Sequence, residues 1–320
     1  MNIIKVKDIK RLIFFFSYKH RNYILWYNLT NKTLWKWGII LKKIVIISLI
    51  VILLLFCGFY LYFQNTALQV TKFLIVDSKI PKSFNNYRII QISDFHNTIS
   101  KKLTNQLVEE ITREEPNIIV ITGDLIDSRR TNVDVAINFL GKIKDIAPIY
   151  YVSGNHESRI SEYETLKKEM NDLGINLLDN EVIEIQKKDD IINLIGIDDP
   201  SFSNTIEVDD CEIIEDQIKS VNYDEDFYTI LLSHRPEVFK TYVNENINLI
   251  FSGHAHGGQI RLPFIGGIFV PNQGFFPKYT SGKYEEKNTT MIVSRGIGNS
   301  LFPFRINNRP ELIVVELKNK

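Results

Sequence analysis

Side chains of the types that bind divalent cations follow five apolar, strand-like runs in this 320-residue sequence. In chain order they are Asp94 and His96, Asp124, Asn155 and His156, His234, and His254 and His256. Of the six histidines, only His20 lies outside these positions. Carboxylates, imidazoles and an amide together suit hard or borderline divalent cations. Because strands of an α/β protein can end at one edge of a sheet, we expect these side chains to converge there on a metal site.

Each of these motifs is weak when it is taken alone. Asp94-Phe95-His96 is a common chance sequence, and Gly123-Asp124 or Gly154-Asn155-His156 could each be an ordinary turn. A lone His234 after a strand is more often a hydrogen-bonded surface histidine. His254 and His256 are separated by one residue, so in extended backbone they would point to the same side. Together, however, the ordered strand ends predict a dinuclear metal site.

The elements that must position these side chains alternate between strands and helices up to about residue 178. Apolar residues at helical spacing predict three helices, over Leu103–Glu114, Val133–Ile146 and Glu162–Leu173. Asn132 is a suitable N-cap for the second helix. This alternation predicts right-handed βαβ units. From about residue 181 the sequence is rich in strands, and Gly257–Gly282 is predicted to be a long structured loop or hairpin near the site.

The segment Ile44–Phe63 has no charged residue, and about 20 apolar residues in a helix span a bilayer core of about 30 Å. Residues 1–43 carry ten of the 38 Lys and Arg residues and one of the 38 acids, whereas the remainder has a formal balance of −9. By the positive-inside rule, the N terminus is cytoplasmic. We therefore expect a single-pass cell-membrane protein with a basic cytoplasmic tail (1–43), an anchor (44–63), a connector with the first strand (64–86) and an extracytoplasmic domain (87–320).

Other interpretations of the apolar segment fit less well. A cleaved signal peptide is disfavoured because the run is too long and no small-x-small site follows it. Cys57 does not fit a lipidation site, because Phe56 precedes it where a small residue is expected. Beyond the segment there is only Cys211, so this part cannot form an internal disulfide. The acidic balance there also argues against nucleic acid as a partner, since such binding draws on Lys and Arg.

The order Asp-x-His, Gly-Asp, Gly-Asn-His-Glu, His and Gly-His-x-His resembles the calcineurin-like metallophosphoesterase family over roughly residues 85–320. Gly257-Gly258-Gln259 and Ser294-Arg295-Gly296-Ile297-Gly298 resemble its membrane-anchored bacterial branch, which includes enzymes similar to UDP-2,3-diacylglucosamine pyrophosphatase. The resemblance implies an α/β fold, a four-layer αββα sandwich preceded by one transmembrane helix. Glu157 departs from the family, in which Asp often follows Gly-Asn-His, but that residue is usually not a metal ligand.

The resemblance also implies a role for each residue. One metal ion would be bound by Asp94, His96, Asp124 and His256, and the second by Asp124, Asn155, His234 and His254. Two cations roughly 3.5–4 Å apart would activate water for attack on phosphorus and neutralise charge on the phosphoryl oxygens. His156 would act at the leaving group, as general acid or charge stabiliser. Mixed nitrogen and oxygen ligands fit Mn²⁺, Fe or Zn²⁺ better than Mg²⁺ or Ca²⁺.

The implied function is that of a membrane-anchored, dinuclear metal-dependent hydrolase, a phosphatase or phosphodiesterase, that cleaves a phosphoester or pyrophosphate bond. Because the anchor holds the site near the bilayer, the expected partner is a phosphorylated small molecule or lipid, with a lipid-linked or envelope compound as one candidate. The alternative is a non-catalytic metal-binding scaffold of the same fold, which is disfavoured because none of the seven ligands is missing. A nuclease would share the chemistry but conflicts with the acidic balance.

Three further groups of residues allow two interpretations each. Three arginines either bind a second phosphate or pair with acids such as Glu311: Arg295, Arg305 and Arg309. Four aromatic residues either form an apolar lip for a lipid tail or, as we favour, pack within the long loop: Phe264, Phe269, Phe275 and Phe276. Asp198-Asp199-Pro200 is expected to be a turn near the active face rather than a source of ligands.

Overall fold

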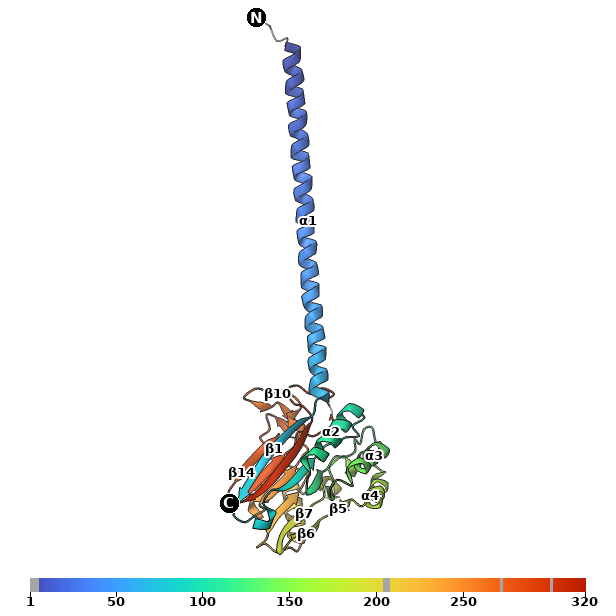
Figure 1. Ribbon diagram of the computed structural model, residues 1–320, viewed down its shortest axis with the longest axis vertical. Coiled ribbons are helices and arrows are strands. Elements are labelled where there is room, and N and C mark those ends of the chain that lie inside the picture. The colour runs from blue at the N-terminus through green and yellow to red at the C-terminus, as the bar shows by residue number, and fades with distance from the viewer. Residues whose placement is uncertain (1–5, 204–207, 271–272, 300–301) are drawn as a thin grey trace. The chain divides into compact units, whose positions relative to one another are not determined.

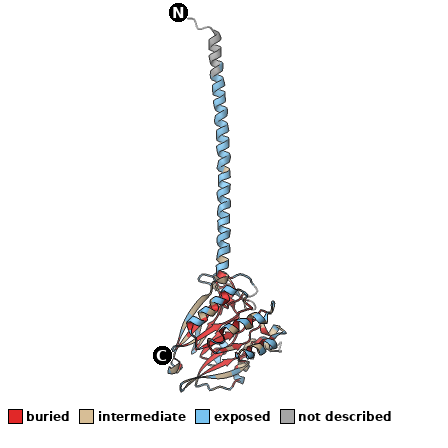
Figure 2. Ribbon diagram, turned by 45° about the vertical axis from the view of Figure 1, so that its right-hand side comes forward, coloured by how far each residue is buried: buried red, intermediate tan, exposed pale blue. Residues whose placement is uncertain are grey.

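A computed structural model describes residues 6–203, 208–270, 273–299 and 302–320 (Figure 1). The chain forms two compact units, Met1–Tyr60 and Leu61–Lys320. One helix, α1 (Val6–Thr66), makes up most of the first unit, and its last residues belong to the second. Its described side chains, from residue 16 on, are exposed almost to its end (Figure 2), and by length and composition this part could cross a membrane. Because α1 has no break near residue 43, the boundary between tail and anchor stays a prediction.

The second unit is built on two six-stranded sheets. In spatial order, the first sheet contains β1 (Gln69–Asp77), β16 (Glu311–Asn319), β2 (Tyr87–Ile92), β3 (Ile118–Thr122), β4 (Ile149–Val152) and β5 (Asn176–Leu177). The second contains β14 (Gly282–Glu286), β15 (Thr289–Val293), β9 (Leu249–Ser252), β8 (Tyr228–Leu232), β7 (Asp190–Gly196) and β6 (Glu181–Lys187). Strands β2 to β5 are parallel to one another, as are β7, β8, β9 and β15. Both sheets are therefore mixed: the first has one antiparallel pair, β16 with β2, and the second has an antiparallel strand at each edge, β14 and β6.

Side chains of a strand alternate between the two faces of its sheet, so each sheet can pack on both faces. Three hydrophobic cores therefore lie between four layers. In β3, Ile119 and Ile121 face the helices, whereas Val120 faces the second sheet. The first sheet is covered by α2 (Lys101–Glu114), α3 (Val133–Ile143) and α4 (Tyr163–Asp172). The second sheet is covered by α5 (Asp210–Ser220) and α6 (Phe239–Asn244). This arrangement confirms the predicted αββα sandwich.

The helix ends follow local sequence signals. Asn132 caps α3 as predicted, with its side chain accepting from the backbone N–H of Val135 at 3.2 Å. That helix ends at Ile143, earlier than expected. Ser100 caps α2, which therefore begins two residues before the predicted start. Helices α5 and α6 had no counterpart in the sequence-based prediction.

The long loop between Gly257 and Gly282 is structured, as predicted, and contains two short antiparallel ladders. One pairs β10 (Arg261–Leu262) with β11 (Gly266–Gly267), and the other pairs β12 (Phe269–Val270) with β13 (Gly274–Phe275). Four short 3₁₀ turns lie between the larger elements of the described chain: η1 (Lys82–Phe84), η2 (Glu157–Arg159), η3 (Pro200–Phe202) and η4 (His256–Gly258). The segment η4 begins four residues after β9 ends, so the loop begins close to the end of a central strand.

Candidate metal centre

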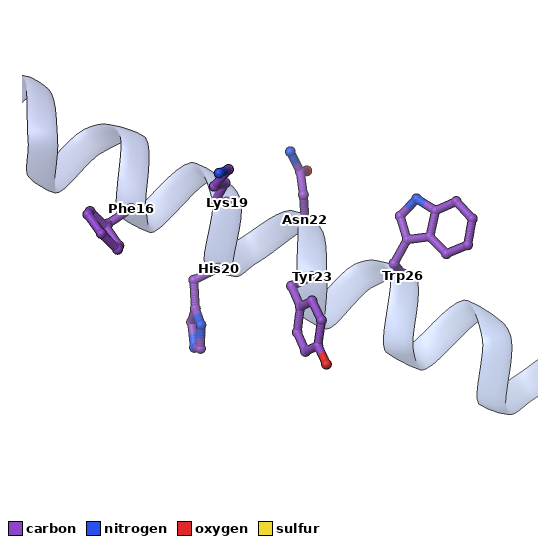
Figure 3. Close-up of a pocket in the computed structure, with 6 residues that line it drawn as sticks. All are labelled: Phe16, Lys19, His20, Asn22, Tyr23 and Trp26. Atoms are coloured by element: carbon purple, nitrogen blue, oxygen red, sulfur yellow. The ribbon is translucent and has the colours of Figure 1, made fainter.

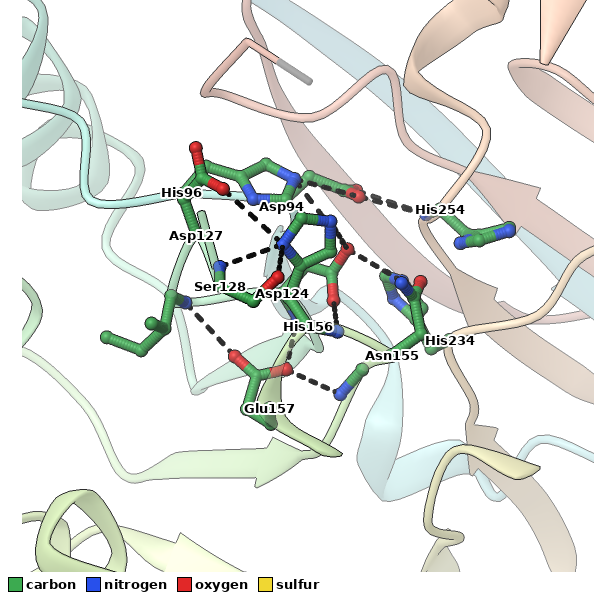
Figure 4. Close-up of polar contacts among 12 residues, drawn as sticks. Asp94, His96, Asp124, Asp127, Ser128, Asn155, His156, Glu157, His234 and His254 are labelled. Carbon is green, nitrogen blue, oxygen red and sulfur yellow. Dashed lines mark hydrogen bonds and ion pairs between the residues drawn. The ribbon is translucent and has the colours of Figure 1, made fainter. Parts of the chain in front are cut away.

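The predicted ligands meet where central strands of both sheets end (Figure 4). From the first sheet, Asp94, Asp124 and Asn155 follow the neighbouring parallel strands β2, β3 and β4. From the second sheet, His234 follows β8 and His254 follows β9. All seven side chains of the predicted ligand set are buried. The structure thus brings together residues that are up to 162 positions apart, from Asp94 to His256.

One group of converging atoms comes from Asp94, His96, Asp124 and His256, the four residues predicted for the first metal ion. Their ligand atoms all lie within 4.8 Å of one another. His256 Nε2 is 3.0 Å from His96 Nε2 and 3.2 Å from Asp94 Oδ1. Asp124 Oδ2 is 3.6 Å from His96 Nε2. Two imidazole nitrogens this close can share at most one proton, whereas a cation would satisfy both lone pairs.

A second group contains Asp124, His234 and His254, which are three of the four residues predicted for the second ion. His234 Nε2 lies 3.2 Å from Asp124 Oδ2, the same oxygen that faces the first group. The other ring nitrogen, Nδ1, lies 2.8 Å from the carbonyl oxygen of Thr122. A neutral ring that donates through Nδ1 leaves its Nε2 lone pair free for a cation. The geometry therefore places Asp124 between two groups of potential ligands.

Asn155, the fourth predicted member of the second group, faces His254. One terminal atom of its carboxamide lies 2.9 Å from His254 Nδ1. With nitrogen on that side, Asn155 donates to His254 and its oxygen accepts from Arg159. With oxygen on that side, two lone pairs face one another and a cation between them would satisfy both. The donor set of two carboxylates, four imidazoles and one amide therefore fits a pair of divalent cations.

The two carboxylates respond differently to the same buried environment. Burial raises the pKa of Asp94 to about 7, an effect that His234 opposes and the charge of Asp124 reinforces. Burial also acts to raise the pKa of Asp124, but His234 and other histidines outweigh it and hold this pKa well below its usual range. Asp124 therefore stays ionised, as a carboxylate that attracts cations must.

The histidines of the groups are mostly neutral. Burial lowers the pKa of His96 to about 3 against the attraction of Asp124, and burial holds the pKa values of His254 and His256 well below the usual range. For His234, burial acts in the same direction, but Asp124 outweighs it and raises the pKa to about 10. Neutral imidazoles are the form that binds metal ions. Three of the four rings thus need no deprotonation before a cation binds.

The backbone at the site is strained. Five of the seven predicted ligands have positive φ angles, namely Asp94 (51°), His96 (47°), Asp124 (51°), His254 (65°) and His256 (45°). Such conformations cost about 1–3 kcal/mol each and persist where the surroundings enforce them, often at functional sites. The expectation that His254 and His256 share an extended backbone and point to one side is therefore wrong. Left-handed turns send His256 to the first group and His254 to the second.

Two glycines allow the strand ends to approach one another. A Cβ on Gly253 would overlap with Ser93 Oγ and lie 2.6 Å from Asp94 Oδ2. A Cβ on Gly154 would collide with the side chain and backbone of Asp124. Any larger residue at either position would displace a carboxylate of the site.

His156 also points into the centre, with a tautomer fixed by the backbone. Its Nδ1 accepts from the backbone N–H of Ser128 at 3.0 Å, so in the neutral ring the proton lies on Nε2. Nε2 is 3.9 Å from Asp124 Oδ2. Burial lowers the pKa of His156, partly opposed by Asp124 and by Asp127, whose Oδ1 lies 3.6 Å from Nδ1. Asp127 was not among the predicted site residues, although it lies only three positions after Asp124.

Glu157 has a structural role that the sequence did not reveal (Figure 4). Its Oε2 accepts from the backbone N–H groups of Asp124 at 3.0 Å and Gly154 at 2.8 Å, and its Oε1 accepts from Ile126 at 3.0 Å. Burial, reinforced by the charge of Asp124, raises its pKa to about 7. Glu157 therefore fixes the loop after β3 to the loop after β4 and so positions two predicted ligands.

The three arginines considered for a second phosphate make structural contacts instead. Arg305 is buried and donates to the carbonyl oxygens of Arg295, Gly298 and Asn308. Arg295 pairs with Glu311 at 2.7 Å. Arg309 donates to the carbonyl oxygens of Ala67 and Leu68. Their geometry supports the structural interpretation, although only Arg295 pairs with Glu311 as expected.

Asp199 and Arg235 form a buried pair that the sequence analysis did not predict. Arg235 donates through Nε to Asp199 Oδ2 at 2.6 Å and through Nη2 to Oδ1 at 2.8 Å. Asp199 lies in the predicted turn after β7, where it also caps η3, and Arg235 directly follows His234. The pair therefore fixes the loop that carries one predicted ligand.

A cavity of about 480 Å³ adjoins the metal centre at His96 and Asp127. Most of its other lining residues carry amide or hydroxyl groups: Asn65, Asn97, Thr98, Ser100, Thr131, Asn132 and Asn299. Asn97 Oδ1 is buried and has no hydrogen-bond partner among the described residues. The cavity can therefore accept a polar, hydroxyl-bearing group beside the metal centre.

A second hollow, of about 490 Å³, lies along α1 and contains no comparable cluster (Figure 3). It is lined only by residues of this one helix: Phe16, Lys19, His20, Asn22, Tyr23 and Trp26. A ligand there would be contacted from one side, so we assign no site to it. His20 belongs to the Met1–Tyr60 unit, and the other five histidines belong to the Leu61–Lys320 unit.

The chain is similar to one known family and to several known proteins. The sequence model of the family described as Calcineurin-like phosphoesterase matches residues 87–258. The uncharacterized metallophosphoesterase YkuE of Bacillus subtilis is 30% identical over 278 residues, which cover 82% of this chain and 90% of that protein. A transmembrane protein with metallophosphoesterase domain from Bos taurus is 30% identical over 73% of this chain and 53% of its own length. The solved structure of TT1561 from Thermus thermophilus covers 66% of this chain and 90% of its own, with a TM-score of 0.47 and 12% identity.

Proposed function

Because the chain belongs to the calcineurin-like phosphoesterase family, we propose that it is a membrane-anchored phosphoesterase that works with two divalent metal ions. The observation that carries this proposal is the position of Asp124, whose Oδ2 lies within 3.6 Å of nitrogens from both ligand groups. Asp94, His96 and His256 would complete the first metal site. Asn155, His234 and His254 would complete the second.

A pair of bound cations would supply an activated water and neutralise charge on the phosphoryl oxygens. The donor types favour Mn²⁺, Fe or Zn²⁺. His156 would donate its Nε2 proton, as a hydrogen bond or completely, to the leaving group, because Ser128 occupies Nδ1. Asp127 would stabilise positive charge on that ring, and Glu157 would keep the loops of Asp124 and Asn155 together.

The substrate we propose is a phosphoester or pyrophosphate compound with a polar leaving group, held in the cavity beside His96. Its lining by amides and hydroxyls supports a hydroxyl-bearing group there. An apolar helix in this chain and a transmembrane relative support membrane association, so a lipid-linked or envelope compound is the class we favour. The sequence likeness to UDP-2,3-diacylglucosamine pyrophosphatase-like enzymes points to the same class. The excess of basic residues before the anchor supports an extracytoplasmic domain.

The full chain, purified in detergent and freed of metal, tests this proposal after reconstitution with Mn²⁺, Fe²⁺ or Zn²⁺. We expect hydrolysis of p-nitrophenyl phosphate or its bis ester with at least one metal, and loss of hydrolysis with EDTA. Binding of two metal ions without any turnover would instead support the non-catalytic scaffold. Comparing the mono and bis esters then separates phosphatase from phosphodiesterase activity.

A further inference from the structure

The loop after the metal centre exposes large apolar side chains where packing was expected. Four of them and two from the segment after β15 form what we call the aromatic rim: Phe264, Phe269, Phe275, Phe276, Phe302 and Phe304. All six are exposed, and Phe264 has no contact that reduces its accessibility. The expectation that the first four pack within the loop is therefore wrong. Two ring pairs are in contact, Phe269 with Phe275 and Phe302 with Phe304. Exposed apolar groups that gather on a folded domain mark a surface for another molecule or a membrane.

The aromatic rim is held by an ordered base. Val270 between its members is buried, and the Cα of Gly267 lies 2.5 Å from the position that a Cβ on Gly258 would occupy. Phe269 and Phe275 are cross-strand partners, with ring centroids 5.2 Å apart. Phe264 and Phe276 have φ angles of 68° and 54°, which are strained for bulky residues. The fold thus presents these rings to the outside at a cost in local backbone energy.

Hydrogen bonds connect the end of α1 to the segment that directly follows Phe304 of the aromatic rim. Gln64 Oε1 accepts from the backbone N–H of Asn308 at 3.1 Å, and Asn65 Oδ1 accepts from that of Arg305 at 3.1 Å. The segment from Arg305 to Asn308 also pairs with the start of the long loop, because the backbone N–H of Arg261 donates to the carbonyl oxygen of Ile306 at 3.0 Å. These contacts all lie within the Leu61–Lys320 unit. They begin one residue after the apolar segment ends at Phe63.

From this connection we propose that the aromatic rim docks into the headgroup region of the bilayer that α1 crosses. Aromatic rings are favoured at this depth, where an apolar body meets a polar boundary. Cationic groups lie beside aromatic rings at the same end of the domain, with Lys102 Nζ 5.3 Å from the ring centre of Tyr62 and the Arg309 guanidinium 5.0 Å from that of Phe63. Both cations would meet lipid phosphates.

Docking would determine which way the metal centre faces. The aromatic rim follows His256 in sequence, and Asn308 Nδ2 donates to the carbonyl oxygen of His256 at 2.7 Å. A rim fixed in the headgroup layer therefore holds the metal centre close to lipid headgroups. This consequence rests on the proposed function, but docking itself depends only on the anchor.

Spin labels on the full chain in phosphatidylcholine–phosphatidylglycerol nanodiscs test the docking. Single cysteines at Phe264→Cys and Phe275→Cys are placed in a Cys57→Ser, Cys211→Ser background. Collision with O₂ and with a water-soluble nickel chelate reports the depth of each label. Leu53→Cys, in the apolar segment, is the control for insertion of the anchor. Val76→Cys is the water control, since it is exposed and lies seven residues along β1, about 23 Å, from Gln69.

We expect the two rim labels to collide more with O₂ and less with the chelate than the label at position 76. Rim labels as accessible to the chelate as that control, with position 53 deep in the bilayer, would overturn the docking. Spin–spin coupling between rim labels of two chains would also overturn it, in favour of a second copy as the partner. Since neither readout requires turnover, a failure of the proposed activity leaves this test unaffected.

Discussion

Asp124 Oδ2 lies 3.2 Å from His234 Nε2, although Asp124 follows β3 of the first sheet and His234 follows β8 of the second. The same oxygen is 3.6 Å from His96 Nε2. The metal centre thus depends on the packing of the two sheets against each other, and Asp124 is its central group.

Replacing Asp124 by Asn should abolish most activity without unfolding the protein. In the native chain the backbone N–H of His156 donates to Asp124 Oδ1 at 2.8 Å, and the oxygen of an amide can still accept this hydrogen bond. The amide removes the negative charge between the two ligand groups. We expect turnover of p-nitrophenyl esters to fall by at least about 10²–10³-fold, the range for one preorganised electrostatic contact. Elemental analysis should show fewer bound metal ions. Asp134→Asn, an exposed change at the start of α3, is the matched control, and equal rates for the two variants would refute the bridging role.

His156→Gln should lower turnover while leaving metal content unchanged. The ring nitrogen Nε2 would be lost as a proton donor, and general acid–base groups contribute about 10²–10⁴-fold. The effect should be smaller for substrates whose leaving group needs no proton, such as p-nitrophenol, than for alkyl phosphates. His20→Gln on α1 serves as the control. A uniform loss for both leaving groups would argue against a role as proton donor.

Glu157→Gln should destabilise the metal-free protein and change its pH dependence. The amide cannot accept all three backbone hydrogen bonds, which costs about 1–3 kcal/mol for the donor left without a partner. Burial first, and then Asp124, raises the pKa of Glu157 from 4.5 to about 7 in the folded chain. Between these values the folded chain keeps a proton that the unfolded chain loses, so the contribution of Glu157 to stability falls as pH rises. Urea unfolding in EDTA at several pH values measures how the free energy of unfolding changes with pH. The decrease that Glu157 contributes should be missing from the variant.

Asp199→Asn should destabilise the fold by up to about 3–5 kcal/mol of unfolding free energy, because it removes the carboxylate that binds the buried Arg235 guanidinium through two nitrogens and leaves only the more distant Glu237 and Asp210. Glu215→Gln, which removes the partner of Lys219 on the surface of α5, should cost much less, because solvent screens an exposed ion pair. Denaturant titration of both variants measures the difference. Similar costs for the two would mean that the interior pair does not hold the loop of His234.

Much of the fold could be predicted from sequence because its signals are local. Buried parallel strands such as β3 are continuous apolar runs, and Asn132 indicates the start of α3 as its N-cap. The predicted ligands follow those runs directly, so strand order was enough to bring them together. The helices α5 and α6 were missed because their apolar positions are few, and the full length of α1 exceeds the apolar segment that indicated it.

What the sequence could not predict depends on contacts between distant residues. Glu157 differs from the residue usual in the family, and only the three backbone groups that it binds explain its place. The arginines at 295, 305 and 309 have the chemistry of phosphate ligands, but the backbone carbonyls that surround them could not be read from spacing. The exposure of Phe264 likewise follows from a positive φ angle, which apolar patterning does not reveal.

The most direct test of the two-metal centre is anomalous diffraction from crystals of the protein grown with Mn²⁺. We expect two anomalous peaks, with Asp124 contacting both, His96 and His256 contacting one, and His234 and His254 contacting the other. A single peak, or two peaks that do not share Asp124, would contradict it.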